Sequence, residues 1–200
     1  MDARQVKTAA RLKEVILALA KDRPTNELTV SEVTAAAGIN RSTFYQHATS
    51  PTDLLEKVLR LELDAIRAEY LTATPEKIDP EAISLTTRAV LVHVEEHAAI
   101  YQRGLGASSG SASLHPLLSG HFAESMEFLF DRHGIELPQV APGAVATTDL
   151  LRHSAARFIA DGVVGVIDVW LRTPHPRSIN DFSAVYTTLV PAWLPHTTSA

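Results

Sequence analysis

The spacing of apolar residues along the chain has the period of an α-helix almost everywhere. A first series consists of Leu12, Val15, Ile16 and Leu19, with charged residues between its members. Positions i, i+3, i+4 and i+7 share one helix face, so this series predicts an amphipathic helix that ends before Pro24. Later segments repeat the same period, and none alternates as a half-buried strand does. The sequence therefore predicts an all-α fold.

Two short helices are predicted next. Thr29 or Ser31 can cap a helix of about two turns, and Gly38 follows it where a left-handed residue suits a helix end. Asn40 offers a second cap immediately afterwards. A third, very short helix is then expected over about 41–47.

The rest of the chain is predicted to be longer helices. Ser50 can cap a helix that starts with Pro51, where the missing N–H costs nothing, and Asp53 faces the positive end of the helix dipole. We expect this helix to run to about Leu71. Further helices are predicted over about 83–101, 117–133, 144–171 and 178–194, with a Gly/Ser-rich loop at 104–113.

Composition narrows the class of protein. The 200 residues are 46% hydrophobic and 20% charged, which suits a chain with one or two packed cores. No stretch approaches the roughly 20 uncharged apolar residues of a spanning helix, and the first residues lack the order of a signal peptide. We therefore expect a cytoplasmic protein without a membrane partner. The absence of Cys excludes disulfides, thiolate nucleophiles and iron–sulfur clusters, and we expect neither a cofactor nor a metal.

Charge is distributed unevenly. Residues 1–50 carry seven Lys or Arg against five acids, and the remainder carries 11 against 18. A mildly basic N-terminal part suits an anionic partner, although a net charge of +2 is commonplace. We expect a DNA-binding domain over 1–50, which takes in the start of the next helix to about 60. A connecting helix over 51–74 and a C-terminal domain over 75–200 complete the predicted organisation.

The short helices have the layout of a helix-turn-helix DNA-binding unit. Its second helix can enter the major groove, and amides at the helix starts near Thr29 and Asn40 attract phosphate oxygens. The side chains placed to reach base edges or phosphates are Arg41, Ser42, Thr43 and Gln46. The spacing alone would also fit a small helical bundle with short capped helices that does not bind DNA.

Residues 28–47 with 50–55 resemble the N-terminal domain of the tetracycline-repressor (TetR) family of bacterial transcription regulators, and the resemblance covers about 8–60. It implies that 40–46 form the recognition helix and that Tyr45 and His47 contact the DNA backbone. It also implies a ligand-released repressor that binds a pseudo-palindromic operator as a homodimer. The residues that carry it are Thr29, Val33, Ala37, Gly38, Ile39, Thr43, Tyr45, His47, Asp53 and Leu54.

Three positions depart from the family's usual residues. Ala48 stands where a Phe is usual, Pro51 where a Lys is usual, and Thr34 where an Ala is usual. Loss of the Lys removes one phosphate contact, which predicts weaker binding with a shallower salt dependence. Loss of the Phe removes an aromatic group that would tie the recognition helix to the core. The base-facing positions are unchanged.

The two C-terminal helices are candidates for a dimer interface. Gly162 and Gly165 lie within a predicted helix, where each Gly costs roughly 1 kcal/mol and close helix approach is the usual compensation. Ala155, Ala156 and Ala160 add to this small-residue surface. We expect helices 144–171 and 178–194 to pair with their copies in a four-helix interface. The alternative is that both are buried within one subunit.

The C-terminal domain is also expected to bind a small molecule. Polar and aromatic groups among its apolar positions could converge on one cavity, which would favour an apolar or aromatic effector. Taken singly, each of these residues could equally be a core or surface residue. The candidates are His93, His97, Tyr101, Phe122, Met126, His153, Phe158 and Trp170.

Two motifs raise the alternative of an enzyme. His93-Val-Glu-Glu-His97 matches the H-x-x-E-H pattern of zinc peptidases, so a metal-dependent hydrolase using His93, Glu96 and His97 is the second hypothesis. A catalytic zinc needs a third protein ligand, and the sequence identifies none. Residues 106–110 match G-x-S-x-G, but a helix rather than a strand is predicted before them, which indicates a flexible loop. We therefore expect no enzymatic activity.

Overall fold

A computed structural model describes residues 3–72, 80–106, 109–133, 135, 137–139 and 147–194. These residues form helices and contain no strand, which confirms the all-α prediction. None of the helices described is long and apolar enough to cross a membrane. The helices are α1 (Ala3–Asp22), α2 (Val30–Ala37), α3 (Arg41–Tyr45), α4 (Pro51–Arg67), α5 (Pro80–Glu96), α6 (Ala98–Leu105), α7 (His115–His133), α8 (Thr148–Leu171) and α9 (Ile179–Leu189), with short turns η1 (Thr25–Glu27), η2 (Ala68–Thr72) and η3 (Gly110–Ala112).

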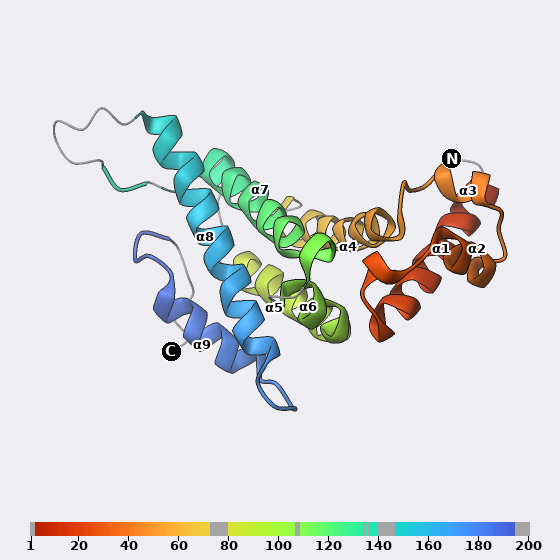
Figure 1. The fold of residues 1–200 in the computed structure, drawn as a ribbon. Helices are drawn as coiled ribbons and strands as arrows, with labels where there is room; N and C mark the ends of the chain where they lie inside the picture. The colour runs from red at the N-terminus through yellow and green to blue at the C-terminus, as the bar shows by residue number, and fades with distance from the viewer. Residues whose placement is uncertain are drawn as a thin grey trace. The chain divides into compact units, whose positions relative to one another are not determined.

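The chain divides into two compact units, of which the first contains Met1–Glu62 and His97–Leu114. Helices α1, α2 and α3 pack together in this unit, as Figure 1 shows. Its interior holds Leu12, Ile16, Phe44 and Leu59, each of which is almost wholly removed from solvent. Burial of these side chains supplies the main stabilisation of the unit.

Local sequence explains how α2 and α3 are placed. The Thr29 hydroxyl accepts from the Glu32 backbone N–H while the Glu32 carboxylate accepts from the Thr29 N–H, a reciprocal cap that starts α2. Gly38 then ends α2 with φ 66°, a left-handed conformation that favours glycine. Asn40 caps α3 directly afterwards. The short turn between these caps fixes the direction of α3.

Residues 97–114 belong to the first unit, although the sequence analysis placed them in the C-terminal domain. The guanidinium of Arg103 donates to the carbonyl oxygens of Ala20 and Lys21 at 2.7 Å each, and so caps the end of α1. Leu114 packs so closely on Gly104 that a Cβ there would lie 2.5 Å from the Leu114 Cγ. Arg103 therefore ties α6 to the end of α1, and the contact of Gly104 with Leu114 ties α6 to the segment that follows it.

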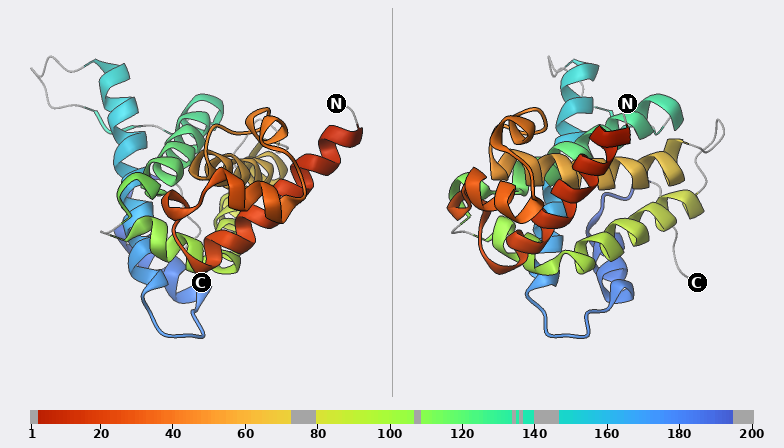
Figure 2. Two further views of the ribbon diagram at one scale, coloured as in Figure 1. Left: turned by 45° about the vertical axis from the view of Figure 1, so that its right-hand side comes forward. Right: turned by 90° about the vertical axis from the view of Figure 1, so that its right-hand side faces the viewer.

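The second unit contains Leu63–Glu96 and His115–Ala200. Helices α7 and α8 pack side by side along much of their lengths (Figure 2), and α5 and α9 also contact each other. The loop between α8 and α9 is tied down by Arg177, which donates to Glu95 at 3.0 Å and to the Leu171 carbonyl at 2.8 Å. These contacts hold four helices around a shared interior.

Several predicted helix limits are corrected. The helix expected over 83–101 is interrupted at His97, which is the N-terminal cap of α6. The helix expected to reach Leu71 is α-helical only to Arg67 and continues as a π-helical turn. At the C-terminus, α9 ends at Leu189, because Pro191 cannot donate a helix hydrogen bond.

Candidate nucleic-acid interface and apolar cavity

A polar groove lies in the first unit, between the start of α1 and the residues in and around α3. It combines residues that the sequence analysis assigned to DNA binding with Arg4, Gln5 and Thr8, which that analysis missed. The basic first turns of α1 were the signal that could have found these three. The groove is lined by Arg4, Gln5, Thr8, Gly38, Ile39, Asn40, Thr43, Gln46 and His47.

Hydrogen bonds orient the first turn of α3. The Asn40 Oδ1 accepts from the Thr43 backbone N–H at 2.8 Å and from the Ser42 hydroxyl at 2.7 Å. The Arg41 guanidinium donates to the Ser31 hydroxyl of α2. Asn40, Arg41, Ser42 and Gln46 are all exposed. The polar groups that can read bases or bind phosphate are therefore on the outer surface of a locally rigid turn.

Tyr45 is an aromatic side chain that the fold leaves in solvent. It is 58% exposed, although its ring meets the buried Phe44 edge to face at 5.7 Å. An exposed tyrosine beside a polar groove offers a hydroxyl to a phosphate oxygen, and phosphate contacts fix register without reading sequence.

The turn that follows α3 is anchored to α4. Lys57 donates to the His47 carbonyl at 3.1 Å and pairs with Asp53 at 3.0 Å. Asp53 also accepts from the Thr49 backbone N–H at 2.7 Å. Burial opposes ionisation of Asp53, but the hydrogen bonds from Thr49 and Lys57 prevail and hold its pKa below the ordinary value. Ala48, where the family usually has Phe, is buried at 2% exposure beside this network.

The other end of the helix-turn-helix is stabilised by an ion pair. Arg23 contacts the Glu32 carboxylate, which also accepts from the Thr29 backbone. The hydrogen bonds from Arg23 and then from Thr29 lower the pKa of Glu32 to about 2. Glu32 is thus ionised at neutral pH and keeps the cap of α2 in place.

An apolar cavity lies within the second unit, enclosed by α5, α7, α8 and α9. About 680 Å³ of space is free of atoms, part of it open to solvent. The part of this space that water-sized atoms can fill is about 80 Å³, below the roughly 300–1,000 Å³ of drug-sized ligand sites, so only a small molecule fits without movement of the helices. The lining consists of Leu71, Ile83, Thr86, Thr87, Val90, Leu91, His121, Phe122, Ser125, Met126, Leu129, Ile159, Val163, Ile167, Phe182 and Tyr186.

One ionisable cluster borders this cavity. His121 is 2% exposed and its Nδ1 lies 3.3 Å from an oxygen of Asp64. Asp64 also pairs with Arg67 at 2.8 Å, and Arg67 reaches Glu124 at 3.2 Å. Burial, and then the positive charge of Arg67, lower the pKa of His121 well below its ordinary value. His121 is therefore neutral at physiological pH.

Two of the predicted ligand-binding residues line this cavity, and the other six do not. Phe122 and Met126 line the cavity, one turn apart on α7. His97 and Tyr101 belong to the first unit. His93 is buried on α5 outside the lining, and Trp170 packs edge to face on Phe182 at 5.7 Å. His153 and Phe158 are exposed on α8.

His121 is the lining residue of most chemical interest that the sequence analysis missed. A usable signal was present, because His121 and Ser125 precede Phe122 and Met126 by one residue each. Both pairs have i, i+4 spacing, so a helix carries them on adjoining strips of one face.

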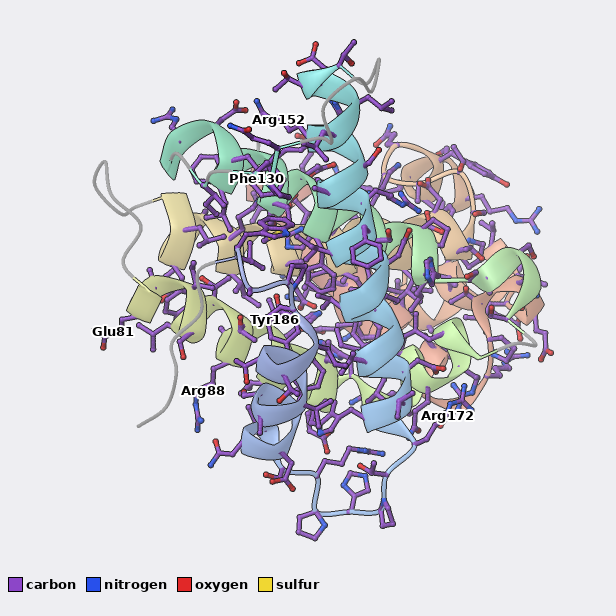
Figure 3. The ribbon with its side chains drawn as sticks, turned by 90° about the vertical axis from the view of Figure 1, so that its left-hand side faces the viewer. Glu81, Arg88, Phe130, Arg152, Arg172 and Tyr186 are labelled. Atoms are coloured by element: carbon purple, nitrogen blue, oxygen red, sulfur yellow. The ribbon has the colours of Figure 1, made fainter. Side chains whose placement is uncertain are left out.

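An apolar face remains open on α8 and α9, which lie side by side in Figure 3 around the labelled Tyr186. Phe158 is 72% exposed and Leu189 is 65% exposed, and both line a shallow groove between the two helices. Gly162 lines the same groove, and neither it nor Gly165 would bring an added Cβ within 4 Å of another group. Monomeric proteins rarely expose apolar surface in this concentration.

Residues 14–58 match the family described as "Bacterial regulatory proteins, tetR family". This match falls on α1 to α4 and includes the helix-turn-helix. It confirms the resemblance that the sequence of this region indicated. No curated protein matches the chain significantly.

Solved structures with the same fold cover nearly the whole chain. A dihydroxyacetone kinase operon activator, DhaS, has a TM-score of 0.56 at 16% identity and covers 91% of this chain and 93% of its own. The fatty acid degradation regulator FadR from Bacillus halodurans has a TM-score of 0.58 at 14% identity, and the match covers 90% of this chain and 94% of FadR. A TetR transcriptional regulator from Rhodococcus sp. RHA1 has a TM-score of 0.57 at 20% identity, and the match covers 92% of this chain and 94% of that regulator.

Proposed function

We propose that this chain, whose N-terminal domain is that of the tetR family of bacterial regulatory proteins, represses transcription from a pseudo-palindromic DNA operator and is released by a small molecule. The observation that carries the proposal is the capped helix-turn-helix of α2 and α3, with its exposed polar groups beside a groove. A protein of this kind acts where bacterial DNA is, so we assign it to the cytoplasm.

The proposed DNA contacts divide into two kinds. Thr29, Asn40, Tyr45 and His47 are assigned to the phosphate backbone, since helix starts and exposed hydroxyl or imidazole groups suit phosphate oxygens. Arg41, Ser42, Thr43 and Gln46 are assigned to base edges and neighbouring phosphates in the major groove. Arg4 at the start of α1 lines the same groove and adds a positive charge beside the recognition helix.

The open face of α8 and α9 supports a homodimer through these two helices. Phe158, Gly162, Gly165 and Val169 follow one another at helical spacing on α8, and Val169 is 66% exposed. A two-fold axis through this face would join it to its copy, as an isologous interface requires. A dimer of this kind presents two recognition helices to half-sites about one helical turn of DNA apart.

The cavity of the second unit supports the sensor part of the proposal. Twelve of its lining residues are apolar or aromatic, including Phe122 and Met126 from the sequence prediction. An effector that prefers one packing of α5, α7, α8 and α9 would shift the population of conformations. A coupling free energy of about 1–3 kcal/mol would change operator affinity roughly 5- to 150-fold.

The hydrolase hypothesis receives no support from the comparisons or the helix layout. His93 belongs to α5 and His97 caps α6, so the motif does not lie on one continuous helix. In the G-x-S-x-G segment Ser108 lies outside the described residues, and α6 rather than a strand precedes it. We accordingly propose a regulator rather than an enzyme.

The test is selection of a binding site from random double-stranded DNA by the full chain, followed by titration of the selected sequence. We expect a pseudo-palindrome bound by two copies. Chains in which Tyr45 and Arg41 are both replaced by Ala should lose this binding. Operator affinity that survives the double replacement in a folded protein would contradict the assignment of α3 as the recognition helix.

A further inference from the structure

Apart from the Tyr186 phenol, the polar groups that line the cavity of the second unit offer hydrogen-bond acceptors more readily than donors. The hydroxyl groups of Thr86, Thr87 and Ser125 each donate to a carbonyl oxygen four residues earlier in their own helix, at 2.7, 2.9 and 2.8 Å. Their protons are therefore engaged, and only oxygen lone pairs remain for a ligand.

His121 adds an acceptor of a more specific kind. Its Nδ1 has no hydrogen bond of good geometry among the described residues, but Asp64 faces it at 3.3 Å. Arg67 lies 2.8 Å from the same Asp64 oxygen. A neutral imidazole beside a carboxylate carries its proton on the facing nitrogen, here Nδ1. The other nitrogen, Nε2, is then an unprotonated acceptor.

No positive charge is available to an anionic ligand in this cavity. The described residues that line it include neither Lys nor Arg, and the nearby Arg67 is already paired with Asp64 and Glu124. Burial of a carboxylate without a counter-charge is strongly unfavourable. Tyr186 stays uncharged as well, because burial raises the pKa of its phenol to about 12.

We propose that the cavity binds an uncharged, mainly apolar molecule that carries a hydroxyl group, an alcohol or a phenol, and that this hydroxyl donates to Nε2 of His121. The proposal rests on the assignment of this cavity as the effector site and names the chemical class of the effector. The twelve apolar lining residues enclose the carbon skeleton, and His121 selects the functional group.

The inference also indicates how occupancy reaches the DNA-binding part of the chain. Asp64 and Arg67 are residues of α4, the same helix that carries Asp53 and Lys57. A ligand hydroxyl that donates to Nε2 draws electron density from the ring and makes the Nδ1–H a stronger donor, so it favours closer pairing of His121 with Asp64. His121 is thus a positioning contact between the ligand and α4.

The experiment compares three probes on one skeleton with the full chain: 4-propylphenol, its methyl ether 4-propylanisole, and 4-propylbenzoate at a pH where it is ionised. Binding is measured by calorimetry without DNA. We expect the phenol to bind about tenfold more tightly than the ether, because the ether cannot donate. The benzoate should bind at least about 100-fold more weakly than the phenol.

Variants locate the effect. In His121→Phe the phenol and the ether should bind within about twofold of each other, because the acceptor is gone while a ring remains. His153→Phe makes the same replacement at an exposed site on α8 outside the cavity, and should keep the preference. Ile83→Trp fills the cavity and should remove binding of all three probes.

Three results would overturn the inference. They are benzoate binding as tight as that of the phenol, equal binding of phenol and ether by the unmodified chain, and absence of phenol binding. The first comparisons use the unmodified chain, so they stand even if His121→Phe fails to fold. Operator affinity is titrated separately: if the phenol binds in the cavity yet operator affinity stays within twofold, the sensor function fails while the ligand class stands.

Discussion

The Nζ of Lys57 lies 3.1 Å from the carbonyl oxygen of His47, and this contact joins α4 to the turn that follows α3. The same ammonium group pairs with Asp53, which also accepts from the Thr49 backbone. Ala48 supplies little packing area where the family usually has Phe. Lys57 therefore ties the turn after α3 to the helix that leads out of the unit.

Lys57→Met should weaken operator binding by about 3- to 10-fold, because loss of a hydrogen bond from a charged donor loosens the end of α3. Fluorescence anisotropy at fixed salt measures this change. Lys13→Met is the matched control, since Lys13 pairs with Glu62 at 2.6 Å in the same unit. An unchanged slope of log affinity against log salt would show that Lys57 positions α3, whereas a slope shallower by about one would show a direct phosphate contact instead.

Tyr45→Ala should reduce affinity for operator and for unrelated DNA by similar factors, since a phosphate contact carries no sequence information. Its exposure of 58% predicts a stability loss of less than about 1 kcal/mol. Tyr45→Phe distinguishes the hydroxyl from the ring. Arg41→Ala or Gln46→Ala should instead change the preference between sequences, by about 1–3 kcal/mol for a base contact. A purely sequence-specific loss in Tyr45→Ala would refute its assignment.

Gly165→Leu should convert the dimer into a monomer or an aggregate while the helix itself stays folded. An added Cβ meets nothing within 4 Å among the described residues, and leucine favours a helix by roughly 0.8–1 kcal/mol over glycine. We therefore expect the disruption to come from the second copy. Gly120→Leu on α7, where an added Cβ also meets nothing, is the control. Analytical ultracentrifugation measures the oligomeric state. If the Gly165→Leu chain is still a dimer at micromolar concentration, this face is not the dimer interface.

Stability should fall on acidification below about pH 6.5, because His121 has a lowered pKa in the folded chain, about 4 against 6.5 when unfolded. Between these values the unfolded state binds a proton that the folded state does not, so unfolding is favoured by up to about 1.4 kcal/mol per pH unit. Below about pH 4 the contribution levels off. The groups that face His121 are Asp64, Arg67 and Glu124.

Urea unfolding of the full chain across this pH range measures that effect. His121→Phe should flatten the dependence, since it removes the titrating group and leaves the three neighbours in place. His153→Phe should leave it unchanged, because His153 is exposed on α8. Equal slopes in the unmodified chain and in His121→Phe would assign the loss to carboxylates instead.

Local signals in the sequence were sufficient for the helix-turn-helix. The caps at Thr29 and Asn40 and the left-handed Gly38 depend on atoms within a few residues of each, so residue order predicts them directly. Helix ends were harder where tertiary contacts decide. The break at His97 lies in a stretch whose apolar spacing runs on without interruption.

Long-range placement could not be read from the sequence. The bond from Arg103 to Ala20 joins residues 83 positions apart, and no local pattern marks either partner. Periodicity predicted that Phe122, Met126 and Phe158 lie on apolar helix faces, but it does not distinguish a face toward a cavity from one left open. The first two line the cavity, whereas Phe158 is 72% exposed.

The membership of α6 in the first unit makes that unit discontinuous along the chain. Residues 63–96 belong to the second unit, and the chain returns to the first unit at His97. Ile100, Arg103 and Leu114 then line a small pocket together with Ala20 and Leu55. A fragment cut after residue 62 would lack this complement and would leave the carbonyls of Ala20 and Lys21 without the guanidinium that caps them. The DNA-binding part is therefore not a detachable module. Exchange of such domains between regulators has to carry residues 97–114 along with the N-terminal segment, or replace them with a surface of the same shape.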